Sequence, residues 1–209
     1  MMKVITIGDS LTQGNPPPEH RAGNSGKYQS YTHAYLKEKG IEVDIWNLGI
    51  GGQLIGQIVN RIKPALPADI VVIMGGTNDV WRFAAIEDDI LDEVVEGILE
   101  EFIYGLEVVK SHPDSGSSKI ILCSIPPFGD VGTVDIRMVN AINKTNAEIQ
   151  DLCEKNENVF FCDVNAAMRL DVPEKFANSK FVVADGVHFT FSGNKACGEA
   201  IAKCIANLV

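Results

Sequence analysis

Short apolar runs alternate along the chain with longer stretches in which apolar residues recur at helical spacing. Five of the short runs are rich in β-branched residues and predict strands at Lys3–Ile7, Glu42–Trp46, Ile70–Met74, Ile120–Cys123 and Val159–Cys162. Hydrophobicity within these runs is continuous, which is typical of strands covered on both faces. The pattern therefore favours a parallel sheet with helices on both sides.

Four stripes of apolar residues follow the spacing of a helix. They are Leu54, Ile55, Ile58 and Ile62, ended by Pro64; Ile86, Ile90, Val94, Ile98, Phe102 and Leu106; Val139, Ile142, Ile149 and Leu152; and Ala200, Ile201, Cys204, Ile205 and Leu208, with Ser192 as N-cap. The alternation of strands and helices predicts an α/β fold, a doubly wound three-layer α/β/α sandwich with a five-stranded parallel sheet. No repeat or linker divides the chain, so we expect one domain over residues 1–209.

Composition narrows the function classes. The 209 residues include 18 basic and 28 acidic side chains, and this net charge of −10 argues against a nucleic-acid partner and against stable membrane association. The five cysteines are odd in number and contain no C-x-x-C pair, which disfavours a disulfide framework and a structural zinc site. The apolar run at the N-terminus is too short for a signal-peptide core or a membrane span, so we expect a cytoplasmic protein.

Ligand sites in open α/β sheets lie beyond the carboxyl ends of the strands. Ser10 follows the first predicted strand in the segment Gly8–Leu11, where its unpaired backbone amide is free to face an anion. The alternative is an ordinary N-cap or turn serine.

The second and third predicted strands are also followed by glycines. The segment Asn47–Gly52 carries three, Gly49, Gly51 and Gly52, which allow backbone to approach a ligand but are equally common in plain turns. Its spacing matches neither a P-loop nor a dinucleotide fingerprint, so a nucleotide site is poorly supported. In Gly75–Asp79, the Asn78 amide is a candidate donor to an oxyanion, and the alternative is an Asx-turn.

An acid and a histidine stand three residues apart near the C-terminus, in the segment Asp185–His188. A carboxylate at this spacing can accept from the imidazole Nδ1–H and orient Nε2 outward as a base. A surface polar contact is the alternative. With Ser10 available as a nucleophile, the pair favours a catalytic role.

The order of these four segments resembles the blocks of the GDSL/SGNH hydrolase family. The resemblance spans residues 8–188 and implies the flavodoxin-like SGNH hydrolase fold. It implies a serine-dependent carboxylic-ester hydrolase in which Ser10 is the nucleophile, His188 the base and Asp185 its orienting acid. The oxyanion hole would combine the Ser10 amide, the Asn78 side chain and one glycine; Gly49, Gly51 and Gly52 compete, and Gly52 is favoured by its distance from Asn47. No metal or cofactor is implied, and Phe189 stands where many members have proline.

The substrate is less constrained. Four aromatics are candidate substrate-binding residues at the cleft: Trp81, Phe83, Phe128 and Phe189. Ordinary packing is the alternative for each of them. For a fifth aromatic, Phe191, packing is the favoured interpretation. Asp9 and Asp79 are interpreted as structural, pairing with backbone amides.

We expect small acyl esters as substrates, including O-acetylated carbohydrates. The alternatives are a lysophospholipase or thioesterase acting on longer chains, and a non-catalytic ligand-binding domain of the same fold. A phosphoacceptor receiver domain is disfavoured, because Asp9 lacks a clustered carboxylate partner and no lysine follows the fifth strand in Phe161–Ala167. The sequence does not predict the oligomeric state.

Overall fold

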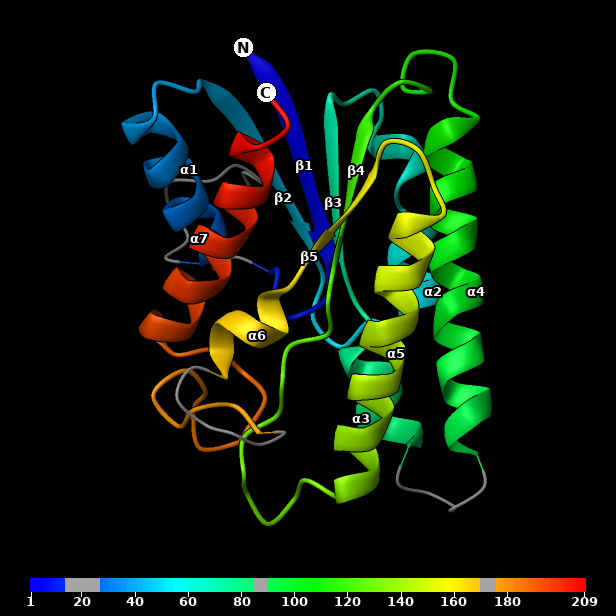
Figure 1. Ribbon diagram of the computed structural model, residues 1–209, viewed down its shortest axis with the longest axis vertical. Coiled ribbons are helices and arrows are strands. Elements are labelled where there is room, and N and C mark those ends of the chain that lie inside the picture. Colours follow the sequence, from blue (N-terminus) through cyan, green and yellow to red (C-terminus); the bar gives the residue numbers. More distant parts are fainter. Residues whose placement is uncertain (14–26, 85–89, 170–175) are drawn as a thin grey trace.

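The computed structural model describes residues 1–13, 27–84, 90–169 and 176–209. Its centre is a sheet of five strands, all parallel, in the order β2-β1-β3-β4-β5 (Figure 1). The strands are β1 (Met2–Gly8), β2 (Val43–Gly49), β3 (Ile70–Met74), β4 (Lys119–Cys123) and β5 (Val159–Cys162). The predicted five-stranded parallel sheet is therefore confirmed.

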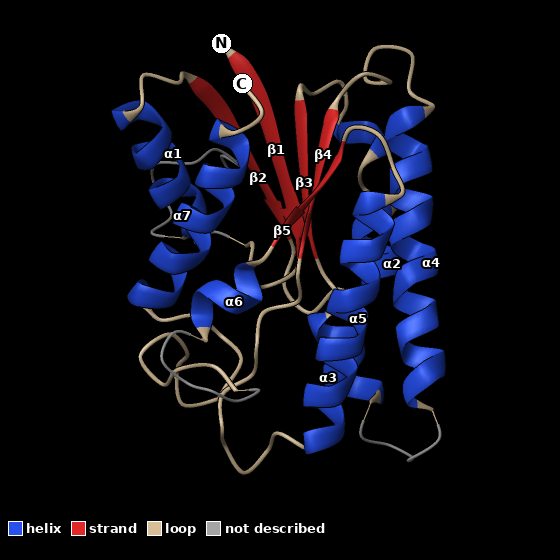
Figure 2. Cartoon of the chain, viewed as in Figure 1, coloured by secondary structure: helices blue, strands red, loops and turns tan. Residues whose placement is uncertain are grey.

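Helices cover both faces of this sheet (Figure 2). On one face lie α1 (Tyr28–Glu38), α6 (Val164–Met168) and α7 (Phe191–Ala206); on the other lie α2 (Ile55–Val59), α3 (Thr77–Phe83), α4 (Leu91–Lys110) and α5 (Ile136–Glu154). Successive residues of β1 enter different cores, because side chains alternate along a strand: Val4 packs with α1 and α7, and Ile5 with α2 and α4. This arrangement is the predicted three-layer sandwich.

The second strand ends later than predicted. It spans Val43–Gly49 rather than Glu42–Trp46, and its ladder with β1 continues to the pair Gly8–Gly49. Its side chains alternate between buried and half-buried, because an edge strand has only one fully covered face. The glycine turn therefore starts at Ile50, and Asn47 belongs to the strand.

Two helix ends also differ from the sequence prediction. Helix α2 stops at Val59, where the Asn60 side chain donates to the Gly56 carbonyl at 2.7 Å, and Pro64 lies in a separate 3₁₀ helix, η1 (Lys63–Ala65). The N-cap of α7 is Thr190, whose hydroxyl accepts from the Gly193 amide at 3.2 Å, so the assignment of Ser192 was wrong. Ile86, the first residue of the predicted second stripe, lies outside the described residues.

The cysteines are all free thiols. Four are buried and Cys204 is partly buried, as expected for small apolar side chains. Burial raises the pKa of the Cys153 thiol to about 12, which keeps it protonated and unreactive at neutral pH. Among the described residues, no helix combines the length and the apolar character that crossing a bilayer requires.

The strand order places the carboxyl ends of β1 and β3 at a topological switch point. The chain passes from β1 to β2 on one side and then crosses back to β3 on the other side of β1. The crevice at such a reversal is the usual ligand site of an open α/β sheet. It lies at the end of the molecule opposite the N- and C-termini (Figure 1).

Candidate active site

Ser10 lies in a hydrogen-bonded turn directly after β1. The Asp9 carbonyl accepts from the amides of Thr12 and Gln13 at 3.1 and 2.9 Å. The Ser10 amide has no hydrogen-bond partner within the described parts of the chain. This turn therefore presents both a hydroxyl and a free N–H at the sheet edge.

The Asp185–His188 loop brings an imidazole to that hydroxyl. His188 Nε2 lies 3.0 Å from Ser10 Oγ, and His188 Nδ1 lies 2.8 Å from Asp185 Oδ2. The other carboxylate oxygen of Asp185 accepts from the amides of Val187 and His188 at 2.8 and 2.9 Å. The three predicted side chains thus form one hydrogen-bonded chain across 178 residues of sequence.

The charge state of Asp185 is controlled by these contacts. Partial burial raises the pKa of Asp185, but hydrogen bonds from the two backbone amides and the imidazole lower it by more, so the resulting pKa lies below the ordinary value. The carboxylate is therefore ionised at neutral pH and can accept from Nδ1–H. The side chains of His188 and Asp185 are 45% and 48% exposed, so solvent reaches this half of the site.

Asn78 occupies the first turn of α3, after Gly76, which adopts a left-handed conformation with φ of 95°. Its side-chain amide donates to the Gln53 carbonyl at 2.9 Å and lies 3.5 Å from Asp9 Oδ2. This contact joins the end of β3 to the glycine turn that follows β2. Asn78 therefore lies next to Asp9, which precedes Ser10, and next to Gln53, which follows Gly52.

The three competing glycines differ in what their amides bind. The Gly49 amide donates to Asn47 Oδ1 at 3.0 Å, and the Gly51 amide donates to Gln13 Oε1 at 2.9 Å. The Gly52 amide has no partner in the described ranges, and φ of 76° places this residue in the left-handed region. A Cβ built on Gly51 would lie 3.7 Å from the Ser10 Cβ, so the turn borders the serine. Of the three, Gly52 has the N–H that is free to bind a ligand.

Two carboxylates below the site are bound to backbone, as predicted. Asp9 accepts from the Leu11 amide at 2.9 Å, and Asp79 accepts from the Ile55 amide at 3.0 Å. Burial raises the pKa of each to about 6, and their hydrogen bonds to backbone amides only partly offset this effect. Both side chains fix loop geometry next to the reacting groups.

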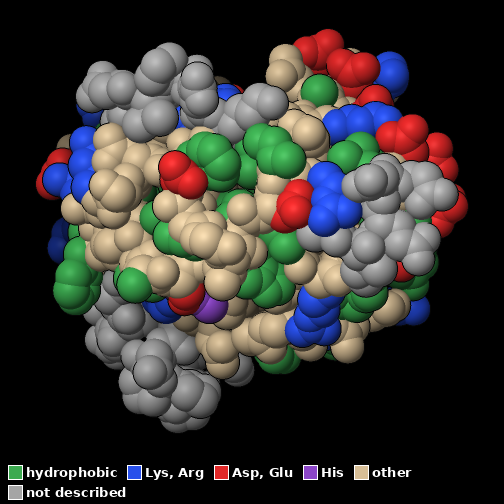
Figure 3. Space-filling model, turned by 90° about the horizontal axis from the view of Figure 1, so that it is seen from below, with side chains coloured by type: hydrophobic (Ala, Val, Ile, Leu, Met, Phe, Trp, Pro, Cys, Tyr) green, Lys and Arg blue, Asp and Glu red, His purple; other side chains and the backbone are tan. Residues whose placement is uncertain are grey.

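The structure divides the candidate aromatics. Trp81 packs edge-on against Phe128, with ring centroids 5.3 Å apart. Phe128 is 1% and Phe189 7% exposed, so neither is open to solvent as a candidate substrate-binding residue at the cleft would be; their rings fill the two cores instead. The packing expectation for Phe191 was wrong in the opposite sense, because this side chain is 79% exposed. On the face where the strands end, hydrophobic side chains are scattered among polar ones (Figure 3).

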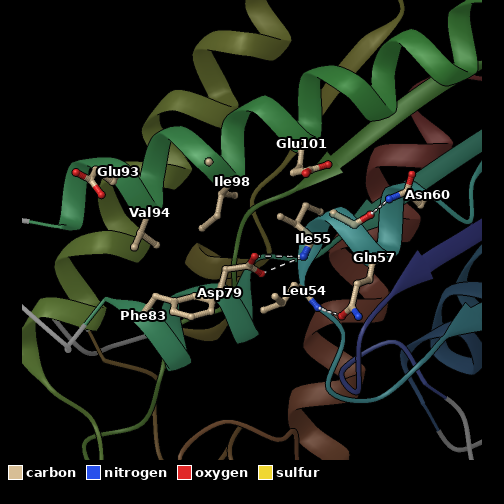
Figure 4. A pocket seen from close by; sticks show the side chains of 12 residues that line it. Leu54, Ile55, Gln57, Asn60, Asp79, Phe83, Glu93, Val94, Ile98 and Glu101 are labelled. Atoms are coloured by element: carbon tan, nitrogen blue, oxygen red, sulfur yellow. Dashed lines mark hydrogen bonds between the residues drawn. The ribbon is translucent and has the colours of Figure 1, made fainter.

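Phe83 lines a separate cavity of about 400 Å³ between α2, α3 and α4 (Figure 4). Asp79, Glu93 and Glu101 contribute carboxylates to its wall, and Val94 and Ile98 contribute apolar surface. Neither Ser10 nor His188 lines this cavity. In the part of the chain that the structure describes, no group of three His, Cys, Asp or Glu side chains is placed to bind a metal ion.

Two arginines near the site donate to backbone carbonyls, and the sequence did not predict this role for either of them. Arg61 donates to the carbonyls of Gly8 and Leu48, at the ends of β1 and β2, and Arg82 donates to the Gly52 carbonyl. A cation next to the apolar stripe of α2 was the one available signal for Arg61. Arg82 is an exposed residue on a short helix, and its position between two candidate cleft aromatics, Trp81 and Phe83, gave no indication of this backbone contact.

The chain belongs to the GDSL-like lipase/acylhydrolase family, whose model matches residues 6–196. The resemblance noted from the sequence is thereby confirmed, and the protein is a carboxylic-ester hydrolase of the GDSL type. A comparison with curated proteins gives no significant match.

Solved structures show the same fold at low identity. An acetylxylan esterase from Geobacillus stearothermophilus is 23% identical with a TM-score of 0.71, covering 97% of this chain and 93% of its own. A protein of the G-D-S-L family from Desulfitobacterium hafniense DCB-2 is 19% identical with a TM-score of 0.67, covering 97% and 99%. These similarities support the predicted SGNH hydrolase fold.

Proposed function

We propose that the protein hydrolyses small acyl esters through an acyl-enzyme on Ser10, with His188 as general base and Asp185 as the group that orients it. The observation that carries this proposal is the chain of two hydrogen bonds, 3.0 and 2.8 Å long, from Ser10 Oγ through His188 to Asp185. A nucleophile bound to a base, which is in turn bound to an orienting acid, is the arrangement that activates serine.

In the first half-reaction, Ser10 Oγ attacks the ester carbonyl carbon and its proton passes to His188 Nε2. Asp185 remains ionised, accepts from Nδ1–H and stabilises the imidazolium. The tetrahedral oxyanion accepts hydrogen bonds from the Ser10 and Gly52 amides and the Asn78 side chain. As the carbon–oxygen bond to the alcohol breaks, His188 returns the proton to the leaving oxygen.

The second half-reaction uses the same groups. His188 takes a proton from water, and the resulting hydroxide attacks the acyl carbon of the Ser10 ester. The second tetrahedral intermediate collapses, Ser10 Oγ leaves and receives the proton from His188, and the carboxylic acid departs. Each group returns to its starting protonation state, as turnover requires.

O-acetylated carbohydrate is the substrate class we favour. The acidic surface, with a net charge of −10, suits neutral water-soluble esters better than anionic lipid. A neighbour in fold is described as an acetyl-xylooligosaccharide esterase, and two variants of that enzyme described as catalytic mutants replace a serine and an aspartate by alanine.

A second candidate is hydrolysis of longer acyl chains, as in a lysophospholipase or thioesterase. Exposed apolar side chains next to the site favour it: Phe191 lies three residues after His188, and Ile50 lies two before Gly52. Such side chains can contact an acyl chain without any deep pocket.

One panel separates these functions. Initial rates on p-nitrophenyl esters from acetate to palmitate, on acetylated xylooligosaccharides and on a lysophospholipid should fall with chain length and include deacetylation of the sugar. A rise in kcat/KM with chain length would instead support the longer-chain candidate.

A fluorophosphonate probe tests the nucleophile itself. It should label native wild-type protein at Ser10 and leave Ser10→Ala and heat-denatured protein unlabelled. Absence of labelling in the native wild type would favour a non-catalytic binding role.

A further inference from the structure

The glycine turn after β2 is held by side chains that are distant in sequence. Its two consecutive carbonyls, those of Gly52 and Gln53, accept from Arg82 Nη2 at 2.7 Å and from Asn78 Nδ2 at 2.9 Å. Both donors belong to α3. A segment with φ of 76° at glycine has wide conformational freedom of its own, so these contacts determine where its amides lie.

Arg61 holds the same turn from the side of the sheet. Its Nη2 donates to the Gly8 carbonyl at 3.1 Å, its Nη1 to the Leu48 carbonyl at 2.6 Å and its Nε to Gln53 Oε1 at 2.8 Å. These acceptors lie at the end of the nucleophile strand, at the end of the next strand and in the turn. One half-buried guanidinium therefore connects three segments that must be in register around Ser10.

The geometry of a guanidinium suits this task. Its donors lie in one plane in a rigid fork, so three acceptors bound to it are fixed relative to one another. A lysine ammonium has donors without that planar spacing and cannot reproduce the three contacts. At Arg82 the contact is single and exposed, and it restrains the turn on its solvent side.

We propose that Arg61 and Arg82 are positioning residues that hold the Gly52 amide in place, in the turn that borders Ser10 through Gly51. The inference rests on the proposed function, in which that amide binds the oxyanion. Oxyanion donors act by being oriented before charge develops, and displacement by about 1 Å can cost on the order of 10²-fold in rate. Neither arginine touches the reacting atoms, so both act through the turn.

The test compares Arg61→Lys and Arg82→Met with Arg137→Met, a matched control whose guanidinium pairs with Asp135 at the start of α5. Three readouts apply to each: kcat and KM on p-nitrophenyl acetate, inhibition by an alkyl boronic acid that forms a tetrahedral adduct on serine, and the melting temperature. We expect kcat to fall about 10- to 100-fold in Arg61→Lys and about 5- to 50-fold in Arg82→Met. KM should change less than about twofold, boronate inhibition should weaken in parallel with kcat, and Arg137→Met should match the wild type.

A double variant tests the route of action. Gly52→Ala strains the left-handed position and displaces the turn, so Arg82→Met should have little further effect in that background. Equal fold losses in both backgrounds would mean that Arg82 does not act through Gly52 and would overturn its assignment.

The remaining outcomes are also decisive. If Arg82→Met keeps wild-type kcat and boronate affinity while Ser10→Ala is inactive, the positioning role fails and the proposed function stands. If Ser10→Ala retains turnover, the proposed function itself fails. If Arg61→Lys loses activity only in proportion to its drop in melting temperature, the loss is a folding effect and contradicts the assignment of Arg61. The result for the exposed Arg82 then decides whether the turn is held by positioning residues.

Discussion

The loop that carries the proposed base and the turn that carries Gly52, one of the proposed oxyanion donors, are built in opposite ways. Asp185 binds the amides of the residues two and three positions ahead, and also binds the ring of His188, so the loop organises itself within four residues. The Gly52 turn and the start of α2, which follows it, are held by side chains eight to thirty residues away from the positions they bind: Asn78, Asp79, Arg61 and Arg82. Both segments reach solvent, because the side chains of His188 and Asp185 are half-exposed and residues 50–52 of the turn are exposed.

Because of this difference, the two halves of the site should respond differently to amino-acid substitutions. A self-contained loop keeps its internal hydrogen bonds wherever the chain carries it, provided that its ends are fixed. A turn held from outside depends on residues that form no motif with it. Substitutions should therefore disturb the base locally and the oxyanion donors from a distance.

The largest expected effect is the loss of the proposed nucleophile, Ser10. Ser10→Ala removes the hydroxyl bound to His188 and should lower kcat by about four to six orders of magnitude. Hydrolysis of p-nitrophenyl acetate with active-site titration measures it, and an unchanged melting temperature excludes unfolding. Near-normal turnover would show that Ser10 is not the nucleophile, and that neither the loop nor the turn acts on it in catalysis.

A smaller loss is expected when Asn78, the proposed side-chain donor on α3 that also binds the turn, is removed. Asn78→Ala should reduce kcat about 10²- to 10³-fold, with KM little changed, since an oxyanion donor acts mainly in the transition state. It also frees the Gln53 carbonyl, so boronate binding should weaken as well. An unchanged rate would remove Asn78 from the mechanism and leave the backbone amides alone.

The buried anchor of the turn should make stability depend on pH. Burial raises the pKa of Asp79 from 3.8 to about 6, so the folded state holds a proton that the unfolded chain releases between these values. The free energy of unfolding should therefore fall as pH rises from 4 to 7, by up to roughly 3 kcal/mol from this group. Asp79→Asn keeps an acceptor for Ile55 and removes the titration.

Urea unfolding of wild type and Asp79→Asn at several pH values measures that difference. The wild type should lose stability relative to the variant as pH rises, and should level off above about pH 7. Asp114→Asn, at an exposed position in the turn after α4, should give a curve parallel to the wild type. If the free energy of unfolding of Asp79→Asn varied with pH in parallel with that of the wild type, the charge of Asp79 would not lower the stability of the folded state.

The smallest expected effect concerns the end of the base loop. Thr190 caps α7, two residues after His188, so Thr190→Ala should lower stability by about 1 kcal/mol. Ser192→Ala, inside the first turn, should change stability much less. Thermal unfolding of both variants measures the two losses of stability. A larger loss in Ser192→Ala than in Thr190→Ala would indicate that Ser192 is the N-cap of α7.

The base loop and the strands were predictable because their signals are local. Continuous apolar runs identified all five strands, the segments after the first and third contained Ser10 and Asn78, and the spacing of an acid and a histidine identified Asp185 and His188. The edge strand β2 was predicted to end too early, because polar Asn47 interrupts the apolar run although the pairing of β2 with β1 continues to Gly49. Helix α1 was not predicted, because its apolar residues form no clear stripe and its stability comes from packing on α7.

Side-chain positions around the cleft could not be predicted in the same way. Whether Phe128 lines a cleft or fills a core depends on Trp81, 47 residues earlier, and no local spacing encodes that contact. Arg61 and Arg82 have the same character. Arg61 binds two main-chain carbonyls and Gln53 Oε1, and Arg82 binds one main-chain carbonyl, so no local spacing encodes their contacts.

The buried thiols give this molecule an internal reporter of its folded state. With four of five cysteines enclosed by the two cores and Cys204 partly covered, a thiol-reactive dye should modify the native protein slowly and the unfolded protein at every cysteine. A phosphonate dye on Ser10 should behave in the opposite way, labelling folded molecules alone. Used together in two colours, the reagents would count intact and unfolded copies in one sample, and would tell an inactive variant that is folded from one that is not.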